Sequence, residues 1–279
     1  LRLLVNCSER ATHKAQADFA QRFRPHGLDD RVLGGCWAMA ETTFALTHGT
    51  GSQTAGVDRL GPAGRSGSLR LPLVSAGTPL PGVEVSVRDP EGRDAGERST
   101  GELWVRAPFL ASGYLGNATA TSEAFAGGWY RTGDLGYRVG EQLYVTGREK
   151  DVLVVAGHNV FPEDVEAVVS AGPGLRPGRV AAFSLFDERL QSERVVVLAE
   201  PSGDPAAVDV PRVLARLVAQ LGVTSVQLHL VDAGWLVKSS SGKIARRASA
   251  TKWLRDRDER ATVASPAQAR SGSAPGEAA

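Results

Sequence analysis

The apolar pattern of this chain changes near Gly147, and that change constrains the fold more than any other feature. Before it, three segments alternate apolar and polar residues and are separated by turn residues, which is typical of strands buried on one face. Beyond it, short apolar strands alternate with stretches of helical period. The pattern predicts an antiparallel, partly open β-layer followed by a compact α+β unit. The alternating segments are Val83–Asp89, Gly101–Ala107 and Gln142–Gly147.

The residues before the β-layer have the pattern of the end of an α/β layer. Leu1–Asn6 and Leu33–Ala38 resemble buried strands, and Ala11–Phe23 between them has apolar residues at near-helical spacing. We expect the chain to be the downstream piece of a longer protein, because it begins with Leu1 inside a strand-like run. His48–Gly67 is rich in Gly, Thr and Ser without an apolar period, which predicts a surface loop.

The unit beyond Gly147 combines strands with helices. Pro162 suits the first position of a helix that runs to about Ser170, and Val210–Leu221 carries one apolar face. A basic helix is expected over Gly242–Arg257, and residues 258–279 are predicted to be disordered because large apolar side chains are scarce there. The strands of this unit are expected in segments 151–157, 179–187, 194–201 and 226–232.

Composition limits the class of protein. A chain of 279 residues with 42% hydrophobic content can form one or two domains, and a formal net charge of +1 gives no general attraction for nucleic acid. No apolar run approaches the roughly 20 residues of a membrane span. The two cysteines, Cys7 and Cys36, are too few for a disulfide scaffold and lack the spacing of a zinc site. A reducing, cytoplasmic setting is expected.

Charged residues lie in turn-rich segments where their side chains can converge on a nucleotide. Asp134 ends the predicted turn Tyr130–Asp134, where a carboxylate can accept hydrogen bonds from the two hydroxyls of a ribose or simply cap the turn. Arg148 follows a strand and can reach ribose or phosphate oxygens, or form a solvated charge pair at a domain edge. Lys150 lies at the predicted domain boundary, where a hinge would be placed.

Two further positions could contribute to a nucleotide site. Lys243 follows the flexible run Ser239–Gly242, which would let an ammonium group enter and leave a site; an ordinary loop before a helix, with Lys243 in its first turn, is the alternative. Trp37 and Glu41 could stack a base and hold a divalent ion beside phosphates. A core tryptophan and a glutamate at a helix N-terminus are the alternative interpretation.

These motifs occur in an order that resembles the adenylate-forming superfamily, which contains acyl-CoA ligases, luciferases, nonribosomal-peptide adenylation domains and fatty acyl-AMP ligases. The order is aromatic-x-x-x-Glu, YRTGD, GRxKD and SSSGK, beginning here at Trp37, Tyr130, Gly147 and Ser239. The segment NCSERAT, which contains Ser8 and Glu9, is similar to the family's segment beside the adenine, and GELWVRAPFLASGYLGN is similar to the strand and turn before its ribose loop.

Within the superfamily, the chain most resembles the fatty acyl-AMP ligases. The stretch AMAETTFALT and the run Gly157–Asp164, with its Asn and Phe-Pro pair leading into an acidic helix, carry this likeness. Acyl-CoA ligases also have an aromatic-Pro pair before this helix, so an acyl-CoA ligase is the alternative.

The resemblance implies a two-step reaction and its cofactors. A carboxylic acid, expected to be a fatty acid, attacks the α-phosphate of ATP to give acyl-AMP and pyrophosphate, with Mg²⁺ present. The acyl group then passes to a phosphopantetheine thiol of an acyl carrier protein or of coenzyme A. Residues 1–147 would be the C-terminal part of the large adenylation domain, 148–151 the hinge and 152–257 the small α+β lid domain.

The resemblance also assigns roles to single residues. Lys243 would neutralise charge that develops between the carboxylate and the α-phosphate, and Glu41 would help to hold Mg²⁺. Asp134 would hold the ribose and Arg148 would support ribose or phosphate. Rotation at Lys150 would withdraw Lys243 after adenylation. Trp37, Ala38, Ser8 and Glu9 would line the nucleotide.

Departures from the family pattern favour a second hypothesis. The family's Ser/Thr/Gly-rich phosphate loop and most of its acyl pocket lie outside this chain, so we expect the chain alone to be inactive. Trp37 and Ala38 replace Tyr-Gly, and Cys7 stands where Gly is common. A non-catalytic remnant of the same fold that binds nucleotide or docks a carrier protein is therefore the second hypothesis.

Overall fold

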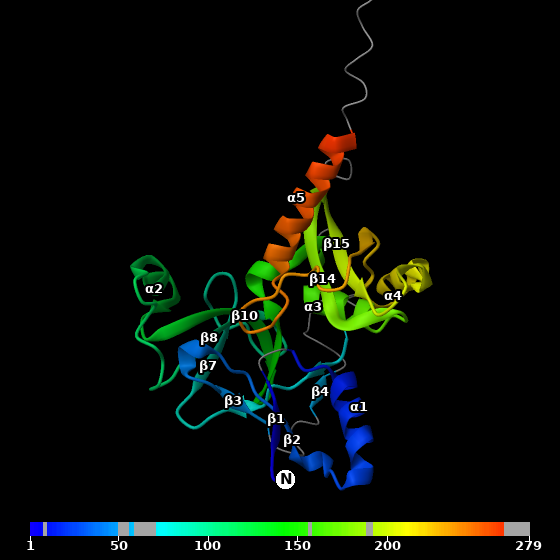
Figure 1. Cartoon of the computed structure of the whole chain (residues 1–279). Coiled ribbons are helices and arrows are strands. Elements are labelled where there is room, and N and C mark those ends of the chain that lie inside the picture. The colour runs from blue at the N-terminus through cyan, green and yellow to red at the C-terminus, as the bar shows by residue number, and fades with distance from the viewer. Residues whose placement is uncertain (8–9, 50–55, 59–70, 156–157, 188–191, 265–279) are drawn as a thin grey trace, which may run out of the picture.

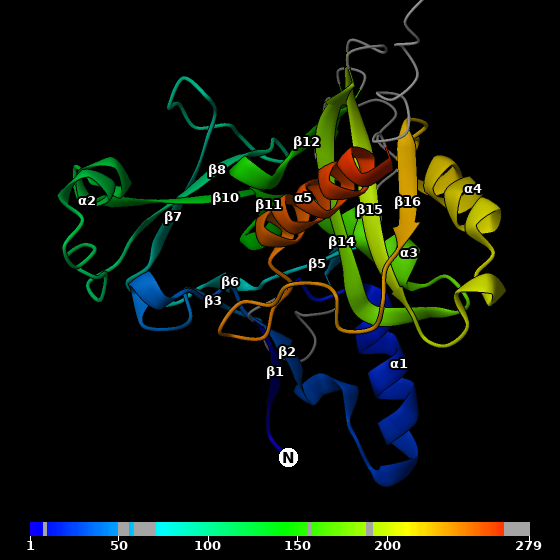
Figure 2. The same ribbon diagram turned by 45° about the horizontal axis from the view of Figure 1, so that its top comes forward.

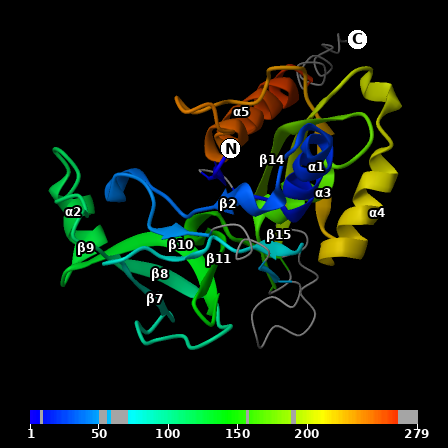
Figure 3. The ribbon, with the colours of Figure 1, turned by 90° about the horizontal axis from the view of Figure 1, so that it is seen from below.

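The computed structural model describes residues 1–264 apart from 8–9, 50–55, 59–70, 156–157 and 188–191. Two sheets organise this part of the chain and lie side by side (Figures 1 and 3). One belongs to the first half of the sequence and the other to the second half. The mixed α/β and α+β architecture expected from the sequence is confirmed.

The N-terminal segment forms a small β-α-β arrangement. Strands β1 (Leu4–Asn6) and β2 (Leu33–Gly35) pair in parallel, with α1 (His13–Phe23) between them in sequence. Thr12 begins the helix, because its hydroxyl accepts the backbone N–H of Ala15 at 3.1 Å. The expected strand–helix–strand order is thus confirmed.

The prediction that Trp37 and Ala38 close a buried strand is wrong. Strand β2 ends at Gly35, and the chain then folds back on itself, with isolated bridges joining Gly35 to Gly49 and Ala38 to Ala45. The backbone N–H of Leu46 donates to the carbonyl of Trp37 at 2.8 Å, so this return fixes the Trp37 backbone.

The first sheet contains five antiparallel strands in the order β11-β10-β8-β7, with β9 also paired to β10. The alternation of β8 decides which side is buried. Leu103 and Val105 are fully buried in one apolar cluster, whereas Trp104 between them lies against Arg88, whose guanidinium carbon is 4.0 Å from the ring centre. The strands are β7 (Glu84–Arg88), β8 (Gly101–Arg106), β9 (Phe125–Ala126), β10 (Trp129–Val139) and β11 (Gln142–Arg148), and α2 (Ala118–Ala124) precedes β9.

The segment Tyr130–Asp134, predicted as a turn, lies within the long strand β10. The register with β8 shifts between Arg131 and Leu135, which marks a β-bulge. Gly133 takes up the irregularity at a φ of 67°, a left-handed conformation that glycine adopts without steric cost. Thr-Gly-Asp has the composition of a turn, and here it produces a bulge because β8 pairs with β10 both before and after it, while β11 pairs from Asp134 onward.

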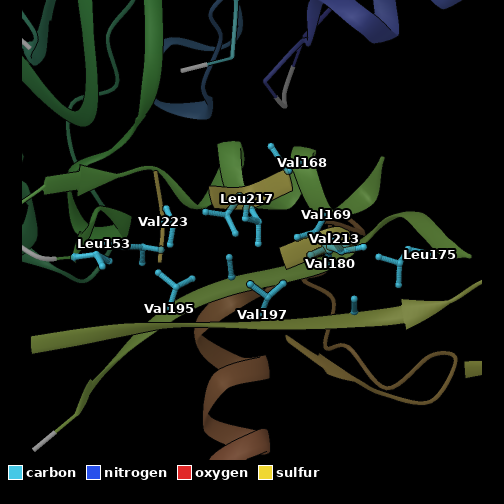
Figure 4. Close-up of a cluster of buried hydrophobic side chains, with 14 of the residues drawn as sticks. Leu153, Val168, Val169, Leu175, Val180, Val195, Val197, Val213, Leu217 and Val223 are labelled. Atoms are coloured by element: carbon cyan, nitrogen blue, oxygen red, sulfur yellow. The ribbon is translucent and has the colours of Figure 1, made fainter. Parts of the chain in front are cut away.

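The second sheet is buried on both faces. Its order is β14-β15-β16, with β14 and β15 antiparallel and β15 and β16 parallel. Alternate residues of β15 point to opposite sides. Val195 and Val197 belong to the cluster beneath the helices α3 (Pro162–Ser170) and α4 (Val210–Leu221) (Figure 4), whereas Val196 and Leu198 pack toward α5 (Arg246–Ala264). The strands are β14 (Leu175–Asp187), β15 (Ser192–Pro201) and β16 (Val226–Leu230).

Two helices of this unit have the predicted bounds and the third does not. Helices α3 (Pro162–Ser170) and α4 (Val210–Leu221) are confirmed. Helix α5 (Arg246–Ala264) begins four residues later than Gly242, where it was predicted to begin, and extends beyond Arg257. Gly242 has a φ of 84°, which an α-helix does not contain, so Lys243 precedes the helix instead of occupying its first turn. Figure 2 shows α5 crossing one face of the second sheet.

Short strands complete the described part of the chain. β4 (Val57–Asp58) lies within the segment predicted as a surface loop and pairs with β5 (Leu73–Val74), and this corrects that prediction locally. β3 (Thr47–His48) pairs with β6 (Thr78–Pro79), and β12 (Leu153–Val155) with β13 (His158–Val160). Among the helices of the described residues, none has the length and apolar character that crossing a membrane requires.

Candidate functional site

Asp134 lies within the bulge of β10, where three parts of the chain meet. The indole N–H of Trp37 donates to Oδ2 of Asp134 at 2.8 Å, and Nε of Arg148 lies 3.1 Å from Oδ1. The sheet itself brings Asp134 and Arg148 together, because the two residues are register partners on β10 and β11. The bulge at Gly133 thus directs the carboxylate of Asp134 toward donors on two other segments.

The groups around Asp134 shift its pKa in opposite directions. Burial raises the pKa of Asp134 above its ordinary value, and the nearby Glu41 carboxylate acts in the same direction. The hydrogen bond from Trp37 and the charge of Arg148 lower the pKa, but burial outweighs them. Each carboxylate oxygen can still accept a second hydrogen bond, so the group can hold a ligand hydroxyl as well.

Trp37 is a buried residue, with 6% of its surface exposed. Its ring packs in the cluster that contains Leu103, and its backbone N–H donates to Oγ1 of Thr47 at 3.0 Å. The contact that the structure shows is therefore with Asp134 through the indole N–H. The predicted position of Trp37 beside an adenine stays a prediction, as does that of the half-buried Ala38.

Glu41 lies in a strained turn. It belongs to the short 3-10 helix Ala40–Thr42, and the next residue, Thr43, has a φ of 64°. A β-branched residue rarely adopts this conformation, and such strain often marks a functional position. The hydroxyl of Thr42 holds the turn by donating to the carbonyls of Met39 and Phe44 at 3.1 and 3.0 Å.

Two tyrosines that no sequence motif marked as site residues contact Glu41 or each other. The hydroxyl of Tyr114 donates to Oε1 of Glu41 at 2.9 Å and lies 3.3 Å from the hydroxyl of Tyr130. Burial raises the pKa of both tyrosines, so both remain protonated donors at neutral pH. No local pattern reveals a partner 73 residues away; only the family-like segment around Tyr114 pointed to this region.

Lys150 lies in the connection between the two halves. The short 3-10 helix Glu149–Asp151 joins β11 to β12, and Arg148 is the last residue of β11. Gly147, just before it, has no room for a side chain, because a Cβ there would come within 2.6 Å of the ring of Phe161. The connection is therefore packed tightly against the start of α3 on its N-terminal side.

Lys243 lies on the Ser/Gly loop between β16 and α5. Its side chain is exposed, and its backbone carbonyl accepts the N–H of Ser239 at 2.8 Å. A bridge between Lys238 and Ile244 closes the loop at its base. Figure 2 shows the loop projecting from the second sheet. Lys243 is thus presented on a closed loop and not on a helix.

Arg246, at the end of that loop, forms ion pairs with three carboxylates that no sequence motif indicated. Its guanidinium lies 2.7 and 2.8 Å from the two oxygens of Glu166, 2.9 Å from Glu163 and 3.2 Å from Asp151. Burial raises the pKa of Glu166 although Arg246 opposes this. Burial lowers the pKa of Arg246, but the three carboxylates together outweigh it and raise that pKa overall. Arg246 therefore connects the Lys243 loop, α3 and the connection that contains Lys150.

The segment that precedes α1 also contacts α3. Nη2 of Arg10 lies 2.8 Å from Oδ1 of Asp164, and the Asp164 side chain is 4% exposed. This ion pair joins the first half of the chain to the second. Ser8 and Glu9, expected beside the nucleotide, lie outside the described residues.

The structure therefore brings some of the predicted site residues together. Trp37, Asp134 and Arg148 are in direct contact, and Glu41 acts on Asp134 electrostatically. Lys150 follows Arg148 by two residues. Lys243 belongs to the other half of the chain.

Comparison with known proteins gives a consistent family. The profile of the family described as AMP-binding enzyme matches residues 1–115. The 4-hydroxyphenylalkanoate adenylyltransferase of Mycobacterium tuberculosis is 31% identical over 91% of this chain and 45% of its own length. A medium-chain-fatty-acid–[acyl-carrier-protein] ligase of Moorena producens is 30% identical over 91% of this chain and 47% of its own length. The chain spans about half the length of the curated relatives it matches.

Solved structures agree on the fold. A structure from a study of fatty acyl-adenylate ligases from E. coli and L. pneumophila superposes with a TM-score of 0.73 at 27% identity, over 95% of this chain and 48% of the other. The McyG A-PCP structure complexed with phenylalanyl-adenylate gives a TM-score of 0.78 at 24% identity, over 94% of this chain and 46% of the other, which indicates the fold alone.

Proposed function

Because the chain belongs to the adenylate-forming superfamily, we propose that the protein containing it activates a carboxylic acid with ATP. A carboxylate oxygen of the acid bonds to the α-phosphorus while the bond to the β-phosphate oxygen breaks, which gives acyl-AMP and pyrophosphate. The observation that carries the proposal is the contact of Asp134 with Trp37 and Arg148 at the bulge of β10.

In this proposal Asp134 holds the ribose of the nucleotide. Its oxygens accept from Trp37 and Arg148 on the protein side and keep lone pairs for the two ribose hydroxyls. Burial raises the pKa of Asp134, and the two protein donors oppose that rise and so favour the ionised form that accepts hydrogen bonds. Arg148, about half exposed, is also free to turn its guanidinium toward a phosphate.

Lys243 would supply positive charge to the reacting atoms. An ammonium group is a compact point charge, and the exposed closed loop between Lys238 and Ile244 can present it to a phosphate. Rotation at residues 148–151 would bring this loop in for adenylation and withdraw it afterwards. Residues 152–257 would then act as the lid and residues 1–147 as part of the large domain.

The residues present fit ATP, and Glu41 fits a role with Mg²⁺. Within the described residues no cluster of three or more His, Cys, Asp and Glu forms a metal cage. Mg²⁺ beside a nucleotide needs only one or two protein carboxylates in addition to phosphates, and Glu41 keeps one oxygen beyond its bond to Tyr114. Bound there, Mg²⁺ would neutralise phosphate charge.

We propose a fatty acid as the substrate and a carrier-protein phosphopantetheine thiol as the acceptor. The thiol sulfur attacks the acyl carbon and AMP leaves. A relative named as an acyl-carrier-protein ligase and a structural neighbour named as a fatty acyl-adenylate ligase favour this choice. Another relative is named as a fatty-acid–CoA ligase, which keeps coenzyme A as the second candidate acceptor. A cytoplasmic location is proposed with it.

Pyrophosphate exchange tests the first step. The full-length protein that contains this chain is expected to exchange labelled pyrophosphate into ATP when a fatty acid is present, and Lys243→Ala is expected to abolish the exchange. Lys238→Ala is the matched control, because it removes the same charge from the base of the same loop. Equal loss in both variants would overturn the role of Lys243, and no exchange across a broad panel of acids would overturn adenylation.

A non-catalytic module that keeps the fold to bind nucleotide or to dock a carrier protein is the second candidate. The buried Trp37, in place of the family's Tyr, favours it. Such a protein would bind ATP without pyrophosphate exchange. Detectable exchange that depends on Lys243 would exclude this candidate.

A further inference from the structure

The two cysteines of the chain face each other at the ends of two paired strands. Strands β1 and β2 are parallel, and their last register partners are Asn6 and Gly35. Cys7 and Cys36 each follow the last residue of their strand, so the same register, continued by one residue, places them opposite each other. Both side chains are half-buried thiols. A sequence of 279 residues with two cysteines would rarely place both side by side by chance.

The spacing of parallel strands suits a covalent link between these residues. Neighbouring strands lie about 4.8 Å apart, which falls within the range of roughly 4.4–6.8 Å that Cα atoms of a disulfide span. Residues at matching positions of two strands also point to the same face. The Cys36 thiol already contacts Cys7 through a side-chain hydrogen bond.

We propose that Cys7 and Cys36 form a reversible disulfide when the protein is exposed to a peroxide, and that this pair is a redox modification site. Hydrogen peroxide oxidises one thiol to a sulfenic acid and is reduced to water. The second thiol then attacks that sulfur, the S–S bond forms, and the hydroxyl leaves with a proton as a second molecule of water. Two thiols and one peroxide thus give one disulfide and two waters.

The two thiols are placed to react one after the other. Burial, followed by the proximity of Cys7, raises the pKa of Cys36 to about 12. Whichever thiol becomes a sulfenic acid first, the other is already in contact with it.

The location gives the pair a consequence for the nucleotide site, and this consequence rests on the proposed function. Cys36 directly precedes Trp37, whose indole N–H holds Asp134. A disulfide restrains Cys36 and, with it, the adjacent backbone that positions this indole. Oxidation is therefore expected to weaken nucleotide binding.

Peptide mapping tests the disulfide without any assay of activity. The full-length protein is treated with hydrogen peroxide, the remaining thiols are alkylated, and trypsin digestion is carried out without reductant. Trypsin releases Leu3–Arg10 and Val32–Arg59, each with one cysteine. We expect these peptides to appear linked, about 2 Da lighter than the sum of the two thiol peptides, and to separate after dithiothreitol is added.

Single variants supply the controls. Cys7→Ser and Cys36→Ser each keep a side chain of similar size and cannot form the link, and circular dichroism checks that each is folded. In each single variant the remaining cysteine is expected to accumulate a sulfenic acid that dimedone traps, because no second thiol is present to resolve it. Two alkylated peptides after peroxide treatment, or two cysteines oxidised beyond sulfenic acid without a link, would overturn the proposal.

Calorimetric titration with ATP tests the consequence. Oxidised wild-type protein is expected to bind ATP about tenfold more weakly than reduced protein, the size of effect that loss of one hydrogen bond to a charged group produces. Dithiothreitol should restore the affinity, and peroxide-treated Cys7→Ser should show no loss. A linked peptide with unchanged ATP affinity would overturn the effect on the site, whereas a reduced protein that binds no ATP would contradict the proposed function and leave the disulfide result standing.

Discussion

The indole nitrogen of Trp37 donates a 2.8 Å hydrogen bond to Asp134, a residue 97 positions further along the chain. The bond joins the turn that carries Glu41 to the bulge of β10. Through this bond Trp37 makes a polar contact that phenylalanine at the same position could not make, since phenylalanine has no N–H to donate.

Trp37→Phe therefore separates the hydrogen bond from the aromatic ring. We expect the KM for ATP in pyrophosphate exchange to rise about tenfold with a smaller change in kcat, because a hydrogen bond to a charged group is lost. Without the indole donor the pKa of Asp134 rises further. As the pH is lowered, Asp134 therefore becomes protonated sooner, and ATP binding should begin to weaken at a higher pH than in the wild type. Trp104→Phe is the matched control, since it removes a 2.8 Å indole bond to Glu102 that Trp37 does not share. The same rise in KM in both variants would contradict the assignment.

Asp134→Asn is expected to separate stability from binding. Burial raises the pKa of Asp134 in the folded state, whereas the pKa of an Asp side chain in the unfolded chain is about 3.9. Between these two values the native state binds more protons, so the stability of the wild type falls as pH rises through that window. The asparagine side chain of the variant does not titrate. The free energy of unfolding of the variant minus that of the wild type should therefore increase from about pH 3.5 to pH 7. Urea unfolding at several pH values measures this difference, and a decrease with pH would contradict it. ATP affinity should fall in the same variant.

Arg246→Met is expected to destabilise the second half of the chain. The substitution leaves the carboxylate of Glu166 buried without its bidentate partner and releases Glu163 and Asp151. Removing one partner of a buried ion pair typically costs about 3–5 kcal/mol. Arg247→Met, the exposed neighbour, should change the free energy of unfolding by less than about 0.5 kcal/mol. Chemical denaturation of both variants decides between a structural anchor and a surface charge.

The ion pair between Arg10 and Asp164 is expected to favour the observed arrangement of the two halves. We predict that Asp164→Asn destabilises the protein by about 2–4 kcal/mol, since the Arg10 charge loses its partner in a largely buried position. Arg10→Met should cost a similar amount, and the double variant less than the sum. A double-mutant cycle measures the coupling energy, and a value near zero would show that the contact does not link the halves.

Local signals predicted some elements to the residue. Helix α3 begins at Pro162 because proline suits the first helical position. The apolar face predicted α4 over Val210–Leu221, and the structure shows that Asp209 caps its start and that Gly222, at a φ of 63°, follows its end. Each of these signals acts within a few residues of the element that it bounds, so a single sequence is sufficient.

Signals that depend on distant partners could not be interpreted from one sequence. The Thr-Gly-Asp run at Asp134 lies in a strand because β8 pairs with β10 before and after it and β11 pairs with β10 from Asp134 onward. The residues of the run itself do not indicate either of these partner strands. The register that brings Cys7 beside Cys36 also requires both strands of a parallel pair. Motif order predicted which residues form the candidate site, while their mutual contacts required the folded chain.

The pairing of Asp134 with Arg148 fixes which residues stay together in the proposed rotation. Both belong to one ladder of strand hydrogen bonds, so a rotation at Lys150, within the proposed hinge of residues 148–151, leaves them on the same rigid body. The ribose contact would persist while Lys243 departs. The adenylate would then remain held through the change of orientation, and its release would be timed by the loss of the acyl group and not by the movement of the lid.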